Sequence, residues 1–255
     1  MAKLEFIIGG AGSGKTQALF ERVKAVKAAG NNAECIVIVP EQATFETEAR
    51  LLSVLPGGLF GVTVTSWKPL ARRVLDSIGI KSAFLSAQGR LMLIRRAADH
   101  SAKEITVFRR SAESRGFPAE CDSLIARFKR CSMSAEDVAS AAEKVGEGTP
   151  LHDKLRDIAL IYSDLERRCA GRYIDSEDMV NAMIARMGES FLNGAYVFID
   201  GGDTMHEHSD PAFRAMLACA AGVTAALTVA DGAIYRPEAR AFERLKAIAE
   251  ETGTP

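Results

Sequence analysis

Short apolar runs alternate with amphipathic segments over the first 80 residues of the chain. Residues 4–8 form a short apolar run, read as a buried strand, and residues 62–65 form a β-branched run. Residues 35–39 are a continuous apolar run, typical of a strand covered on both faces of a parallel sheet. Residues 16–29, 44–55 and 67–78 follow these runs and have the spacing of amphipathic helices, with Gly-Asn or Pro-Gly clusters after the first two. Three successive strand–helix units predict a doubly wound α/β layer.

The pattern changes after residue 86, and no convincing strand is found as far as about residue 187. Helices are expected there at residues 88–100, 119–131, 135–144, 151–169 and 176–187. Ser134 followed by Asp137, and the pair Asp175-Ser176, are capping signals. Strand character returns at residues 195–200 and 223–229. The chain is therefore interpreted as one α/β domain, in two parts at residues 1–82 and 191–255, interrupted by an all-helical insertion at residues 83–190.

Composition and charge indicate an ordinary globular protein. Apolar residues make up 47% of the chain and the net charge is −1, so any contact with nucleic acid must come from a local patch. No uncharged apolar run approaches the roughly 18 residues that span a bilayer, and no secretory signal opens the sequence. The five cysteines are scattered without a C-x-x-C pair, which favours reduced thiols. We therefore expect a cytoplasmic protein without membrane contact.

Eight residues between the first strand and the first helix match the P-loop pattern G-x-x-x-x-G-K-[ST]. They are Gly9, Gly10, Ala11, Gly12, Ser13, Gly14, Lys15 and Thr16. Glycines allow a tight turn that points several N–H groups into one concavity, and the following helix adds its positive N-terminal end. In such loops the lysine reaches the β and γ phosphates and the hydroxyl ligates Mg²⁺. The sequence predicts that the chain binds ATP or another nucleoside triphosphate, together with Mg²⁺.

An acid at the end of a neighbouring strand would complete this site. The apolar residues 196–199 lead to Asp200, at the edge where ligands bind in open α/β sheets. We expect Asp200 to hold Mg²⁺, directly or through water, and a plain strand-end aspartate is the alternative. Gly201 follows where motor ATPases of this architecture usually place a glutamate that activates water. We therefore expect little hydrolysis and assign no catalytic residue.

Several segments resemble the B subunit of the bacterial AddAB helicase–nuclease. They are the P-loop, residues 36–48 (IVIVPEQATFETE), residues 62–71 (VTVTSWKPLA), residues 116–117, residues 171–178 (GRYIDSED) and residues 197–201 (VFIDG). The resemblance implies a UvrD-like helicase fold, in which a RecA-like P-loop parallel-sheet domain carries an all-helical, 1B-like insertion. It covers only the N-terminal portion of such a subunit, whose nuclease domain and iron–sulfur cluster would lie downstream. Gly202 departs from the family, which usually has an aromatic residue there.

The resemblance also implies a role in processing double-strand DNA ends for recombination, with a helicase-nuclease A subunit as partner and single-stranded DNA as ligand. In helicases of this architecture the strand crosses the loops that follow the sheet strands, here residues 40–44 and 65–68. These loops offer Thr44, Thr65, Ser66, Trp67 and Lys68 as DNA-binding residues. For Trp67 a place in the core is the alternative to stacking on a base.

Two further function classes stay open: a P-loop kinase of a small metabolite, with the helical region as its lid, and an inactive scaffold fragment. The segment at residues 40–48 favours the helicase-like interpretation over the kinase. A metal site at His206, Glu207, His208 and Asp210 is another hypothesis, although loops of this composition are usually solvated. Basic stretches of the insertion, such as residues 127–130, are interpreted mostly as solvated helix faces, and a DNA-backbone track is the alternative.

Overall fold

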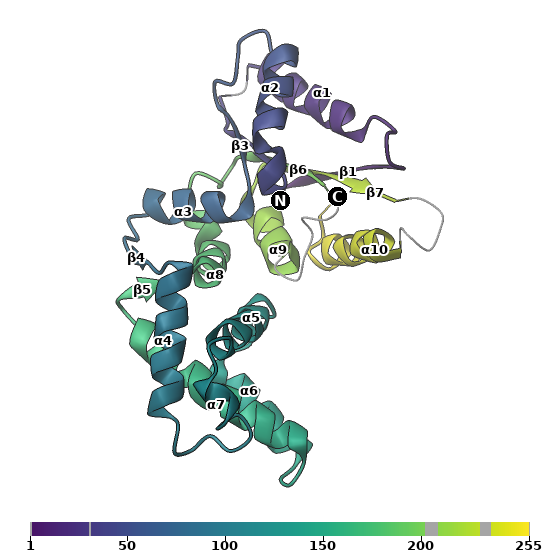
Figure 1. The fold of residues 1–255 in the computed structure, drawn as a ribbon. Coiled ribbons are helices and arrows are strands. Elements are labelled where there is room, and N and C mark those ends of the chain that lie inside the picture. Colours follow the sequence, from purple (N-terminus) through teal and green to yellow (C-terminus); the bar gives the residue numbers. More distant parts are fainter. Residues whose placement is uncertain (1, 31, 202–208, 230–235, 255) are drawn as a thin grey trace. The chain divides into compact units, whose positions relative to one another are not determined.

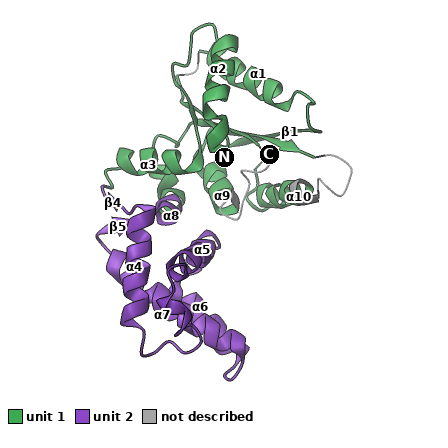
Figure 2. Cartoon of the chain, in the orientation of Figure 1, with its two compact units in different colours: residues 1–80, 182–255 green, residues 81–181 purple. Residues whose placement is uncertain are grey.

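The computed structural model describes residues 2–30, 32–201, 209–229 and 236–254, in two compact units (Figures 1 and 2). Unit 1 comprises residues 1–80 and 182–255, and unit 2 comprises residues 81–181. No helix in the described part of the chain combines the length and the apolar character needed to cross a membrane.

Unit 1 is built on a five-stranded sheet with the order β1-β7-β6-β2-β3. Its strands are β1 (Lys3–Gly9), β7 (Gly222–Thr228), β6 (Tyr196–Asp200), β2 (Cys35–Ile38) and β3 (Val62–Thr65). Every neighbouring pair is parallel, so all the strands end at the same edge. The α/β fold with a parallel sheet that the sequence predicts is therefore confirmed.

Helices cover both faces of this sheet. They are α1 (Lys15–Ala28), α2 (Thr44–Val54), α3 (Trp67–Ser77), α9 (Ser209–Cys219) and α10 (Arg236–Glu251), with single 3-10 turns η1 (Glu41–Ala43) and η3 (Met187–Glu189). Figure 1 shows α1 and α2 on one side of the sheet and α9 and α10 on the other. Leu19 and Phe20 of α1 pack with Phe198 of β6 in one core, while Phe6 of β1 contacts the rings of Phe213 and Phe242 on the other side.

Unit 2 is mainly helical. It contains α4 (Ala87–His100), η2 (Ser111–Glu113), α5 (Phe117–Arg130), α6 (Ala135–Val145), α7 (Pro150–Cys169) and the first turns of α8 (Ser176–Arg186). The capping signal at Ser134 is confirmed as a reciprocal capping box with Asp137. The expectation of no strand between residues 86 and 187 is wrong at β5 (Tyr173–Ile174), which pairs in parallel with β4 (Ala83–Phe84). Two residues are too few to show a period-2 pattern in the sequence.

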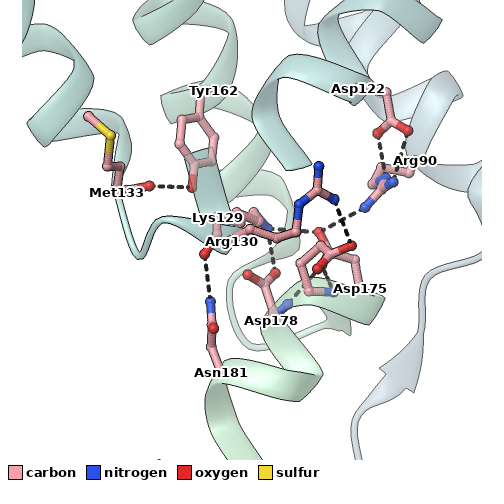
Figure 3. Close-up of polar contacts among 10 residues, drawn as sticks. Arg90, Asp122, Lys129, Arg130, Met133, Tyr162, Asp175, Asp178 and Asn181 are labelled. Carbon is pink, nitrogen blue, oxygen red and sulfur yellow. Dashed lines mark hydrogen bonds and ion pairs between the residues drawn. The ribbon is translucent and has the colours of Figure 1, made fainter. Parts of the chain in front are cut away.

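A buried ion cluster joins α5 to α8 within unit 2 (Figure 3). The Lys129 ammonium donates to Asp175 at 2.7 Å and to Asp178 at 2.6 Å, and only 5% of the Lys129 side chain is exposed. The other oxygen of Asp175 accepts from the N–H groups of Glu177 and Asp178, which caps the start of α8. The expectation that residues 127–130 lie on a solvated face is therefore wrong for Lys129. The spacing of residues along α5 does not reveal that two carboxylates from a distant part of the sequence pair with this lysine.

The charges of this cluster shift one another's pKa values. Burial alone lowers the pKa of Lys129, but Asp175 and Asp178 outweigh it, so the pKa is raised. Burial alone raises the pKa of Asp175, but Lys129 and the amides that it caps leave that pKa below its ordinary value. For Asp178, burial and the negative charge of Asp175 together outweigh Lys129, and the pKa is raised. The ammonium is thus shared unequally, with Asp175 as its firmly ionised partner.

Further contacts extend the cluster to α4. Arg90 donates from Nη2 to the Asp122 carboxylate at 2.8 Å, and its Nη1 lies 3.7 Å from Asp175. The Nε atom of Arg90 is 2.5 Å from the second Asp122 oxygen, an ion pair without hydrogen-bond alignment. The Asn181 amide donates to the Lys129 carbonyl at 3.1 Å. Helices α4, α5 and α8 are therefore connected by charges as well as by apolar packing.

Candidate nucleotide-phosphate site

The P-loop residues form the connection between β1 and α1, and glycine is required at several of its positions. Gly12 has a φ of +75° and Gly14, the residue before α1, has a φ of +86°, a region that side chains with a Cβ rarely adopt. A Cβ on Gly9 would lie 2.4 Å from the Ser13 hydroxyl oxygen. The loop folds back on itself, with the Ser13 N–H donating to the Gly10 carbonyl at 3.3 Å.

This turn leaves a set of backbone donors without acceptors among the described residues. The backbone N–H groups of Gly12, Gly14, Lys15 and Thr16 donate to no acceptor in the described ranges. They lie at the positive end of α1, whose first turn contains no acidic residue. The Lys15 ammonium donates to the Gly10 carbonyl at 2.7 Å, which holds the positive charge at the same loop. The residues present therefore fit a phosphate group.

Asp200 lies at the carboxyl edge of the sheet, but the expectation that its strand neighbours the P-loop strand is wrong. Strand β7 separates the two, because Ala226 pairs with Ile7 on one side and with Asp200 on the other. Adjacent strands are about 4.8 Å apart, so the backbones of Ile7 and Asp200 are separated by roughly 10 Å. A strand's place in the sheet depends on long-range pairing, which its own apolar pattern does not encode.

Asp200 keeps a carboxylate available at this edge. The side chain is partly buried and makes no hydrogen bond or ion pair to any described residue. Because β1 and β6 are parallel members of one sheet, their carboxyl ends face the same side as the phosphate-binding loop. The partial burial and the free carboxylate suit a divalent cation held directly or through water.

The two expected DNA-binding loops follow neighbouring strands and are joined by a hydrogen bond from the Val39 N–H to the Thr65 carbonyl, 2.9 Å long. Thr65 and Ser66 are buried, and the Thr65 hydroxyl donates to the Ser66 carbonyl. Trp67 is partly buried and Lys68 is exposed. In the other loop the Thr44 hydroxyl donates to the Glu41 carbonyl at 3.0 Å. Lys68 and part of Trp67 are therefore the groups most open to a ligand.

Phe45 is a candidate that the sequence reasoning missed. It lies in the first turn of α2, directly after Thr44, and 82% of its side chain is exposed. The buried positions of α2 are Thr47 and Leu51, four residues apart on the opposite face. The sequence alone could have indicated this, because the helical spacing puts the Phe45 ring off the face that packs on the core. A ring in that position is available to contact a ligand or a partner.

The hypothesis of a metal site falls largely outside the described residues, where His206, Glu207 and His208 lie. Asp210 accepts a hydrogen bond from the Arg244 guanidinium at 3.0 Å. Among the residues that the structure describes, no three histidine, cysteine or acidic side chains are grouped as metal ligands.

The chain matches a known family over nearly its whole length. The family model described as "ADDB, N-terminal" matches residues 6–255. Two relatives, from Bacillus cereus (strain B4264) and Bacillus anthracis, are each named as the B subunit of an ATP-dependent helicase/deoxyribonuclease and are 31% identical to this chain over 267 residues. Each alignment covers 97% of this chain and 23% of the relative, so the chain spans about a quarter of these relatives' length. Because the family model matches residues 6–255 and these relatives align over 97% of the chain, the chain belongs to the ADDB N-terminal family.

Proposed function

We propose that unit 1 binds the phosphates of a Mg²⁺-bound nucleoside triphosphate, as the nucleotide-binding region of a helicase–nuclease subunit that processes DNA ends. The observation that carries the proposal is the P-loop with its unsatisfied N–H groups and the Lys15 ammonium. These groups would hold the phosphates, while Thr16 and Asp200 would hold Mg²⁺. The names of the relatives, which include "ATP-dependent", support the same assignment.

Binding rather than turnover is the proposed role of the nucleotide. Hydrolysis needs a group that orients and activates water, and the residue after Asp200 is Gly201, which has no side chain to do so. Its φ of +109° favours glycine at this position. The bound nucleotide would then stabilise unit 1 and its loops, and the motor activity of a complex would come from a helicase-nuclease A subunit.

Single-stranded DNA is the proposed ligand of the same sheet edge. Phe45 and the exposed part of Trp67 offer rings for stacking, and Lys68 offers a charge for a phosphate. Glu41 and Glu46 beside Phe45 limit the positive potential. Binding should therefore be weak, insensitive to base sequence and detectable at low salt.

Calorimetry with Mg²⁺–ATP tests the nucleotide site. Lys15→Ala should lower the affinity at least tenfold, because the lysine supplies the charge that contacts the β and γ phosphates. Lys24 is on the same helix, its side chain is 44% exposed and it lies outside the P-loop, so Lys24→Ala is the matched control and should bind like the wild type. Equal affinities for wild type and Lys15→Ala would rule out this site. DNA-stimulated phosphate release that disappears in Asp200→Ala would contradict the proposal of binding without turnover.

Fluorescence anisotropy with a labelled oligothymidylate at low salt tests the DNA edge. Base–aromatic stacking is worth ~1–3 kcal/mol, so Phe45→Ala should weaken binding roughly 5- to 150-fold. Phe60→Ala is the matched control, since Phe60 is 86% exposed but precedes β3 at the amino edge of the sheet. If both substitutions have the same effect, the carboxyl edge is not where DNA binds.

A further inference from the structure

Unit 2 contains a cavity of about 550 Å³, which is lined by residues of α5, by Ile158 of α7 and by the segment that precedes α5. Its floor is apolar and includes Phe108, Phe117 and Ile158, and its rim carries the hydroxyls of Ser111, Ser114 and Ser123. The two phenylalanine rings lie 5.7 Å apart between centroids and are tilted by 51°. An apolar floor with a few polar groups at its rim, in this size range, is the usual composition of a small-molecule or base pocket.

One wall of the cavity is held in place by a buried carboxylate. Asp157 of α7 is 0% exposed and accepts hydrogen bonds from the N–H groups of residues 106–108, at 3.0, 2.8 and 3.0 Å. These three amides belong to a segment without regular structure, so Asp157 fixes the backbone that carries Phe108. Burying a carboxylate is unfavourable unless it is well hydrogen-bonded, and here its main partners are the amides of this wall.

A second clamp holds the rim. The Arg95 guanidinium of α4 donates from Nη1 to the carbonyls of Ala112 and Ser114, at 2.7 and 3.2 Å. The segment is thereby attached to α7 at one end and to α4 at the other. The cavity is therefore preformed, which lowers the entropic cost of binding a ligand in it.

Arginines without an ion-pair partner among the described residues lie on or next to the segments that line this cavity. Arg109, Arg110, Arg115 and Arg127 line it or adjoin its lining residues, all are exposed, and none forms an ion pair with a described residue. Other arginines of unit 2, such as Arg90 and Arg130, are paired with carboxylates. The four arginines outnumber the acids of residues 109–127, which are Glu113, Glu120 and Asp122, and Asp122 is already paired with Arg90. The rim therefore favours a polyanion, and guanidinium groups match phosphate geometry.

We propose that this cavity accepts one unstacked base of a single-stranded nucleic acid, with the surrounding arginines on the adjoining phosphates. The base would lie against Phe108 and Phe117, and the serine hydroxyls can donate to or accept from its edge. Hydroxyls that both donate and accept make the pocket tolerant of different bases. The proposal rests on the DNA-binding role proposed above, but not on nucleotide binding by the P-loop. The DNA would then have two contact regions on the chain, this cavity on unit 2 and the carboxyl edge of the sheet on unit 1.

Anisotropy at low salt with two labelled strands tests the proposal, one an oligothymidylate and the other an abasic strand of equal length. The double variant Arg110→Glu/Arg127→Glu should lower the affinity for both strands at least tenfold. Arg172→Glu is the control, since Arg172 is exposed, unpaired with any described residue and not part of the cavity lining. If the double variant and the control bind equally well, the arginines do not contact phosphates and the proposal is overturned.

A cavity-blocking variant tests the base. Gly116 lines the rim with a φ of −82°, and a Cβ there would meet no atom within 4 Å, so Gly116→Leu adds bulk without backbone strain. It should lower the affinity for oligothymidylate several-fold and leave the abasic strand unchanged. Gly57→Leu, an equally open glycine in unit 1, is its control. Equal losses for both strands, or none, would overturn the pocket.

Two further measurements separate this proposal from the others. Phe45→Ala tests the edge of the sheet. If Phe45→Ala loses DNA binding while Gly116→Leu binds like the wild type, the pocket is overturned and the proposed function stands. The reverse result would support the pocket and contradict the edge. A labelled acidic peptide with one aromatic residue is the competing ligand. If Gly116→Leu weakens binding of the peptide but not binding of oligothymidylate, the cavity is a protein-docking site and the nucleic-acid assignment is wrong.

Discussion

Replacing Lys129 by methionine should destabilise unit 2 strongly, although methionine fills a similar volume. The substitution removes the one ammonium between Asp175 and Asp178 and leaves two carboxylates close to each other (Figure 3). Asp175 would stay 3% exposed, with its amide partners and the Arg90 guanidinium 3.7 Å away. These remaining partners compensate for only part of the lost charge.

The magnitude follows from the distances and the burial. Two unit charges 2.7 Å apart attract by about 6 kcal/mol at an effective dielectric constant of about 20. Desolvation of the buried ions offsets much of this gain in the wild type, so the net worth of the pair is far smaller. Removing one partner alone is different, because the desolvation cost of the other remains. Breaking a buried pair in this way costs about 3–5 kcal/mol, and we expect the lower end for Lys129→Met.

Urea denaturation followed by far-ultraviolet circular dichroism measures this loss. Arg127→Ala on the same helix is the control, because an exposed side chain without a partner among the described residues should change stability by about 0.5 kcal/mol or less. The triple variant Lys129→Met/Asp175→Asn/Asp178→Asn should recover most of the loss, since it removes the stranded charges and keeps a capping side chain before α8. A Lys129→Met variant as stable as the control, or a triple variant no more stable than the single one, would contradict a stabilising role for this ion cluster.

Three further predictions concern pH, the cavity wall and the P-loop. The depressed pKa of Asp175 contributes stability above its ordinary value of 3.8 that is lost at lower pH, so the penalty of Lys129→Met, measured by urea denaturation, should shrink below about pH 4. Asp157→Ala leaves three amide N–H groups without an acceptor and should lower the free energy of unfolding by about 3 kcal/mol in the same assay. Glu104→Ala, at an exposed position, is the control and should lower it by about 0.5 kcal/mol or less. Gly14→Ala forces alanine to a φ of +86°, so the thermal transition temperature should fall, and Mg²⁺–ATP should raise that temperature less than it does for the wild type. The control Gly57→Ala should change neither the transition temperature nor its shift with Mg²⁺–ATP.

Most helices and strands could be located from the sequence because their cause is local. The apolar runs at β1 and β2 and the helical spacing of α4 to α7 place each element within one or two residues of its observed bounds. The order of the strands could not be predicted, and the assumption that β6 neighbours β1 was wrong, because β7 pairs with both. Pairing between strands more than two hundred residues apart depends on which faces the helices cover, and no local pattern records that.

The same distinction applies to the polar residues. The P-loop could be assigned from the sequence because a continuous segment contains all of its donors. Asp157 and Lys129 could not be assigned, since each has its partners 46 to 51 residues away and looks in the sequence like a solvated position on a helix. Both residues are buried and satisfied, so they hold backbone in place and have little capacity left for a ligand. The P-loop amides and the arginines next to the unit 2 cavity are the opposite case. They have no partners in the described part of the chain, so they are free to bind phosphate, and the amides are also held in place by the backbone of the loop.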